Sequence, residues 1–122
     1  MALYRVYSAI FLWKCGKMNI NTEFASGRLT VYLSGELDQH EARRVLRSLD
    51  EVLDEYLPRD CVLDLSRLSF MDSSGIALIL RVNRRMKDQG GRAWVENPAR
   101  QPLRVIDASG IDRLVPVTAA RH

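Results

Sequence analysis

Apolar and polar residues alternate in two short stretches near the start of the chain, which is the pattern of strands with one buried face. The first stretch covers residues 19–24, and the second covers residues 29–33 and stops at Ser34-Gly35. Ser26-Gly27 lies between them and predicts a turn. Two strand-like stretches around a glycine-containing turn indicate a β-hairpin.

After Asp38 the apolar residues recur three and four positions apart, which is the spacing along one face of an α-helix. Asp38 is the natural N-cap of this helix, and Glu41 three residues later completes an arrangement like a capping box. Leu57-Pro58 ends the helix, because proline disfavours helical backbone at the residue before it. The apolar positions of the predicted helix are Ala42, Val45, Leu46, Leu49, Val52, Leu53 and Tyr56.

Predicted strands and helices alternate in the second half of the chain. Cys61 to Leu65 is a continuous apolar run, typical of a strand that is buried on both faces of a sheet. A helix with apolar positions from Ile76 to Met86 follows, and Gly90-Gly91 ends it. The further predicted elements are a strand at Arg92–Glu96, a short helix from Asn97-Pro98 or Gln101-Pro102 to about Ser109-Gly110, and an edge strand over residues 114–117.

This order of elements predicts an α/β fold with one mixed sheet of about five strands and three or so helices packed mainly on one side. Residues 18–118 form the predicted single domain, and residues 119–122 are expected to fray. Residues 1–17 are interpreted as an N-terminal extension, either disordered or preceding a true start at Met18. Its apolar run, residues 6–13, is far shorter than the roughly 20 residues that span a bilayer.

The composition of the chain argues against binding of nucleic acid, metal ions or cofactors. The chain has 122 residues and a formal net charge of +3, and its Lys and Arg residues are dispersed, so direct binding of nucleic acid is not expected. The two cysteines, Cys15 and Cys61, and the two histidines, His40 and His122, have no metal-ligand spacing. No metal and no cofactor are therefore expected.

The segment Asp72-Ser73-Ser74-Gly75 joins the buried strand to the second helix. Asp and Ser are helix N-caps, so two hydroxyls are expected at the positive end of a helix dipole, as a plain cap, a nucleophile or a modification site. A nucleophile is disfavoured because the Gly-x-Ser-x-Gly spacing is absent and His40 is the only plausible base. Phosphate-binding glycine motifs are absent too. Caps and strand ends explain Asp38, Asp64 and Asp72 without a metal.

Three separated segments carry a resemblance to a known family: Leu33-Ser34-Gly35-Glu36-Leu37-Asp38, residues 68–76 around the two serines, and Asp107-Ala108-Ser109-Gly110-Ile111. Through them the chain from Met18 to about Val117 resembles the STAS-domain family, and in particular its bacterial anti-sigma factor antagonists of the sporulation and general-stress switches. The resemblance implies a single STAS domain that is not an enzyme, is cytoplasmic and has no transmembrane segment.

The resemblance also implies a switch. Ser73 would be phosphorylated by a partner that is both an anti-sigma factor and an ATP-dependent serine kinase. The unphosphorylated protein would bind this partner and release the sigma factor, and a serine phosphatase would restore binding after phosphorylation. The residues that the resemblance assigns to partner binding are Asp38, Glu36, Asp72, Ser74, Gly75 and Ile76.

Two other functions stay open. Relatives with this fold regulate membrane-associated transport complexes, and the apolar run of residues 6–13 motivates that alternative. A hydrolase that uses Ser73 or Ser74 with His40 is the less favoured one.

Overall fold

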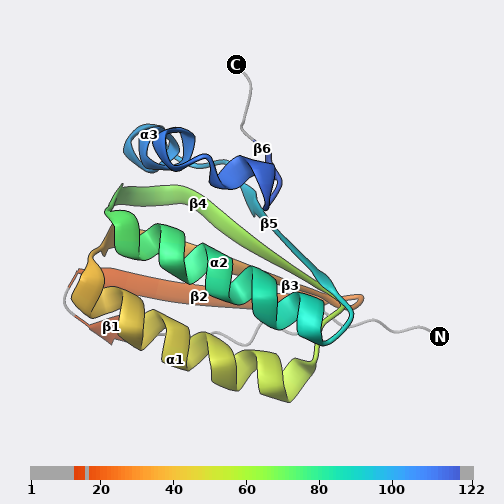
Figure 1. The fold of residues 1–122 in the computed structure, drawn as a ribbon. Coiled ribbons are helices and arrows are strands. Elements are labelled where there is room, and N and C mark those ends of the chain that lie inside the picture. The colour runs from red at the N-terminus through yellow and green to blue at the C-terminus, as the bar shows by residue number, and fades with distance from the viewer. Residues whose placement is uncertain (1–12, 16, 119–122) are drawn as a thin grey trace.

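The computed structural model describes residues 13–15 and 17–118, which form a single mixed β-sheet with three α-helices (Figure 1). The strands lie side by side in chain order. They are β1 (Trp13–Cys15), β2 (Met18–Ala25), β3 (Arg28–Leu37), β4 (Asp60–Met71), β5 (Arg92–Glu96) and β6 (Val117–Thr118). The helices are α1 (Gln39–Tyr56), α2 (Ser73–Asp88) and α3 (Arg100–Ser109), followed by a 3-10 turn, Ile111–Arg113. The predicted α/β class, mixed sheet and helix order are confirmed.

The sheet changes from antiparallel to parallel at β3. β2 and β3 form the predicted antiparallel hairpin, in which Ser26 and Gly27 both have positive φ. β3, β4, β5 and β6 are parallel neighbours, because α1, α2 and α3 each return the chain to the same end of the sheet. As a result the carboxyl ends of β3 and β4, where α1 and α2 begin, lie at one edge.

Helices α1 and α2 lie next to each other across one face of the sheet (Figure 1). The apolar stripe of each helix faces the strands, as its three- and four-residue spacing predicts. The core side chains of the two helices include Val45, Leu49, Leu53, Leu78, Ile79, Val82 and Met86, and those of the strands include Ile20, Leu29, Val31, Leu33, Leu63 and Leu65. Each large apolar side chain buried there contributes about 1.5–3 kcal/mol.

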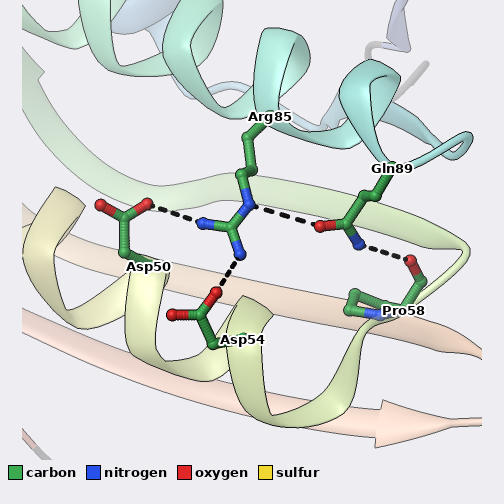
Figure 2. Close-up of polar contacts among 5 residues, drawn as sticks. All are labelled: Asp50, Asp54, Pro58, Arg85 and Gln89. Carbon is green, nitrogen blue, oxygen red and sulfur yellow. Dashed lines mark hydrogen bonds and ion pairs between the residues drawn. The ribbon is translucent and has the colours of Figure 1, made fainter.

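A group of polar contacts also joins α1 to α2 near the C-terminal ends of both helices (Figure 2). The Arg85 guanidinium donates to Asp50 Oδ1 at 3.2 Å and to Asp54 Oδ1. Arg85 Nε donates to the Gln89 amide oxygen at 3.3 Å, and Gln89 Nε2 donates to the carbonyl oxygen of Pro58 at 3.3 Å. These contacts fix the two helices relative to each other at this end.

The structure differs from the sequence-based expectation in four strands. Trp13–Cys15 belongs to the predicted extension, yet it pairs with β2 as an additional strand. The predictions that β3 stops at Ser34-Gly35 and that β4 ends at Leu65 are wrong. The two strands continue to Leu37 and Met71, because each supplies a hydrogen-bonding partner for the other. The final strand is Val117–Thr118 rather than residues 114–117. The other predictions about the termini concern residues 1–12 and 119–122, which lie outside the described part of the chain.

One glycine permits the extension of β3. Gly35 has a φ of +103°, which disfavours any other residue. A Cβ at this position would lie 1.8 Å from the carbonyl oxygen of Lys17. The sheet register also shifts at this point, between Gly35 and Glu36. Gly35 therefore allows β3 to continue beyond its pairing with Met18, the first residue of β2, as far as Leu37. Asp38 then follows at the carboxyl end of β3.

Candidate functional site

The two acidic turns predicted from the sequence lie side by side at the carboxyl edge of the sheet. Leu37, the last residue of β3, pairs with Met71, the last residue of β4. The backbone N–H of Asp72 donates to the carbonyl oxygen of Leu37 at 3.4 Å. Asp38 and Asp72 thus follow directly after paired residues, so the two turns lie at the carboxyl ends of neighbouring strands.

Each turn ends in an aspartate that caps the helix after it. Asp38 Oδ1 accepts a hydrogen bond from the Glu41 N–H at 2.9 Å at the start of α1. Asp72 Oδ1 accepts from the Ser74 N–H at 2.8 Å, and its carbonyl accepts from the Gly75 N–H at 2.9 Å. Both caps satisfy N–H groups that a helix start leaves unpaired. Asp38 is the predicted cap of α1, and Asp72 holds the same position in α2.

Ser73 and Ser74 occupy different environments although they are neighbours. Ser73 is the first residue of α2 and is exposed, whereas Ser74 is half-buried and its N–H is bound by the cap. Gly75 is buried against Met71, where a Cβ would lie 2.6 Å from the sulfur. Ile76 is half-buried and packs on the core. Of this segment, Ser73 presents the hydroxyl that an external enzyme reaches most readily.

The charges around the turn are mixed. Lys17 Nζ lies 3.7 Å from Glu36 Oε1 and 4.0 Å from Asp38 Oδ2. The pKa of Asp38 is lowered, chiefly by the hydrogen bond from the Glu41 N–H and further by the positive charge of Lys17. A shallow hollow of about 380 Å³ lies at the turns, lined by Asp38, Gln39, His40, Arg43 and Asp72. At neutral pH Asp38 is therefore a carboxylate at the surface, in the hollow that Asp72 also lines.

The described residues do not arrange His40 and the two serines as a hydrolytic site would require. His40 is exposed, and within residues 13–15 and 17–118 no hydrogen bond joins it to Ser73 or Ser74. The carboxylate of Asp64 lies on the sheet and accepts from the Ser66 N–H at 3.0 Å and from the Ser66 hydroxyl at 2.7 Å. Burial raises the pKa of the Cys61 thiol to about 12, which leaves it a poor nucleophile.

Metal-ligating residues do not gather in the part of the chain that the structure describes. No group of three or more His, Cys, Asp or Glu side chains lies close enough there to hold an ion. Of the two histidines and two cysteines of the chain, His122 lies outside the described residues, and the structure does not describe the side chain of Cys15. The two turns offer carboxylates, hydroxyls and backbone dipoles.

One residue that supports the turn escaped the sequence analysis. The side-chain amide of Gln101, in α3, accepts from the Met71 N–H at 2.8 Å and donates to the Met71 carbonyl at 3.1 Å. This is the hydrogen-bond pattern of a neighbouring strand, and β5 has already ended at Glu96. Gln101 thereby fixes the residue directly before the Asp72 cap. A glutamine on a helix carries no sequence signal for such a role.

Comparison with known proteins identifies the family. Residues 19–122 match the STAS domain. The chain belongs to the STAS-domain family. It is 35% identical over 100 residues to an anti-sigma F factor antagonist of Paenibacillus polymyxa, which covers 82% of this chain and 86% of the relative.

Solved structures of STAS proteins share the fold. The structure of the unphosphorylated anti-sigma factor antagonist SpoIIAA superposes with a TM-score of 0.70 at 26% identity, covering 80% of this chain and 86% of that one. The phosphorylated form of the Bacillus cell-fate determinant SpoIIAA gives 0.63 at 26% identity, covering 80% and 89%. In this STAS domain, none of the described helices is both long and apolar enough to cross a membrane.

Proposed function

We propose that this STAS domain is an anti-sigma factor antagonist that phosphorylation of Ser73 switches off. In the unphosphorylated state it binds an anti-sigma factor, which is also an ATP-dependent serine kinase, and the sigma factor is released. Phosphate on Ser73 prevents this binding, and a serine phosphatase reverses the modification. The contact surface includes Asp38, Glu36, Asp72, Ser74, Gly75 and Ile76.

The observation that carries the proposal is the exposed Ser73 hydroxyl at the first position of α2, beside the Asp38 and Asp72 turns. The relatives named above as anti-sigma factor antagonists support the role. The cap by Asp72 holds the backbone of the turn without using the Ser73 side chain. The hydroxyl therefore remains available to an incoming kinase.

Electrostatics explains why a phosphate here acts on binding and not on the fold. A phosphoserine carries about −1.5 to −2 charges and three acceptor oxygens. At the N-terminus of α2 the helix dipole favours that charge by about 0.3–1 kcal/mol. In a complex, however, the same dianion must lose water beside Asp38 and Asp72. A penalty of about 3 kcal/mol in the complex weakens binding roughly 100-fold.

Incubation with the cognate anti-sigma factor and ATP, followed by mass mapping of the modified peptide, tests the proposal. We expect one phosphate on Ser73, complete loss of labelling in Ser73→Ala, and retained labelling in the neighbouring control Ser74→Ala. Ser73→Asp is expected to keep the circular-dichroism spectrum of the wild type and to lose binding. Phosphate on another residue, or a melted Ser73→Asp protein, contradicts the proposed switch.

A further inference from the structure

A groove between α1 and α2 opens directly beside the Ser73 turn. It has a volume of about 390 Å³ and is lined by apolar side chains from both helices and by two arginines: Ala42, Leu46, Ala77, Leu78, Arg43 and Arg81. Ser74 also lines it, so it begins at the switch turn. Gln39 and Arg43 line both this groove and the hollow that contains Asp38 and Asp72. The groove and the turn are therefore one continuous surface.

The two arginines of the groove are available to a partner. Arg43 and Arg81 are both exposed, and in the part of the chain that the structure describes neither has an ion-pair partner. Arg85, one turn beyond Arg81 on α2, differs because Asp50 and Asp54 of α1 neutralise it (Figure 2). The helix pair is thus joined by ion pairs at one end, whereas Arg43 and Arg81, nearer to Ser73, stay exposed.

The positive charge continues along the outer side of α2. A second hollow of about 500 Å³ shares Ala77 and Arg81 with the groove and adds Arg84 and Lys87. Leu80 in the same hollow is 38% exposed and adds apolar surface beside these cations. Neither Arg84 nor Lys87 forms an ion pair among the described residues. This surface thus presents apolar side chains flanked by cations.

We infer that the groove binds an acidic amphipathic segment of the anti-sigma factor, with its apolar side chains between α1 and α2 and its carboxylates on Arg43 and Arg81. The inference rests on the proposed function and adds the chemistry of the partner segment. An apolar groove between helices suits an amphipathic helix. Exposed arginines select carboxylates, because the guanidinium binds them in a bidentate manner. A small ligand fits less well, because convergent buried polar groups do not line the groove.

This arrangement also connects binding to phosphorylation. Ser73 precedes Ser74, which lines the mouth of the groove. A phosphate on Ser73 places a dianion where the acidic segment enters, and it repels the carboxylates that Arg43 and Arg81 attract. Phosphoserine and the carboxylates of the partner segment therefore repel each other at the mouth of the groove. The switch then needs no movement of either helix.

Charge reversal tests the inference in the full chain with the cognate anti-sigma factor as the titrant. We expect Arg43→Glu and Arg81→Glu each to weaken binding about 10-fold and to reduce its dependence on salt between about 50 and 300 mM. Arg104→Glu, an exposed arginine of α3, is the matched control and is expected to bind like the wild type. Replacing a carboxylate of the partner segment with Lys should restore affinity for Arg81→Glu.

Filling the groove provides a second test that does not depend on charge. Ala77→Trp occupies the space between the helices from an exposed position, so folding is preserved and binding is expected to fall more than 10-fold. Ala108→Trp, at an exposed position of α3, is the control. Circular dichroism and the thermal midpoint of each variant report whether it is folded.

The outcomes separate the two proposals. Wild-type affinity in Arg43→Glu, Arg81→Glu and Ala77→Trp, with binding still lost after phosphorylation of Ser73, overturns the groove assignment alone. A wild-type protein that neither binds the anti-sigma factor nor is phosphorylated by it overturns both. Self-association of the wild type that Arg81→Glu abolishes assigns the groove to a second copy and also overturns the inference.

Discussion

Gln101→Leu tests how strongly α3 holds the switch turn. The variant keeps a side chain of similar size but removes both hydrogen bonds to Met71, which measure 2.8 Å and 3.1 Å. Met71 is fully buried and lies directly before the Asp72 cap. The backbone N–H and carbonyl of Met71 would then have no partner in place of the amide, and each such loss costs about 1–3 kcal/mol, reduced where water enters.

We expect Gln101→Leu to lower the free energy of unfolding by about 2 kcal/mol, which corresponds to a decrease of about 8 °C in the thermal midpoint of a domain of this size. The Met71 N–H should also exchange with solvent faster, while the Asp72 N–H, which donates to β3, stays protected. Urea unfolding and amide exchange by NMR measure the two effects. Gln89→Leu is the control, because the hydrogen bonds of the Gln89 side-chain amide are longer and lie at the C-terminal end of α2, away from the Ser73 turn.

The reasoning would be refuted by a Gln101→Leu protein whose unfolding free energy and Met71 exchange rate both match the wild type. A general loss of protection across α3 and β4 would also contradict it, because that pattern indicates damage to packing rather than loss of two bonds.

Three further predictions concern other parts of the fold. Arg85→Met should lower stability by about 1–2 kcal/mol in urea unfolding, and a double-mutant cycle with Asp50→Asn should show coupling; additive effects would rule out the ion pair as a contributor. Gly35→Ala should lower the unfolding free energy by more than about 3 kcal/mol because its Cβ would overlap backbone, whereas Gly90→Ala, with open space around it, should cost about 1 kcal/mol. Because the pKa of Asp38 is lowered in the folded state, its contribution to stability is present above the ordinary carboxyl pKa and is lost as pH falls through the folded value; unfolding midpoints from pH about 6 to about 2 should decline less in Asp38→Asn, and equal declines would contradict this.

The helices and their caps could be predicted because their signals are local. The apolar spacing of α1, the Asp38 cap and the Leu57-Pro58 end each depend on neighbouring residues and agree with the structure. The same holds for the strand Arg92–Glu96 and for α3. The Ser73 turn was also predictable, because capping residues follow a buried strand and precede a helical pattern.

The remaining features depend on contacts between distant residues. β4 continues to Met71 through exposed polar positions such as Ser66 and Arg67, which interrupt the apolar run and hide the strand. The support from Gln101 depends on where α3 lies relative to the end of β4. The groove is formed by side chains of both α1 and α2, and neither helix alone reveals it.

The central claim is that one phosphate on Ser73 abolishes binding without changing the fold. Titration of the anti-sigma factor with the unphosphorylated and the Ser73-phosphorylated protein, each checked by NMR for an intact core, tests it most directly. We expect affinity to fall at least about 100-fold on phosphorylation while the core spectrum stays the same. Equal affinities of the two forms, or a phosphorylated protein that has lost its fold, would contradict the account.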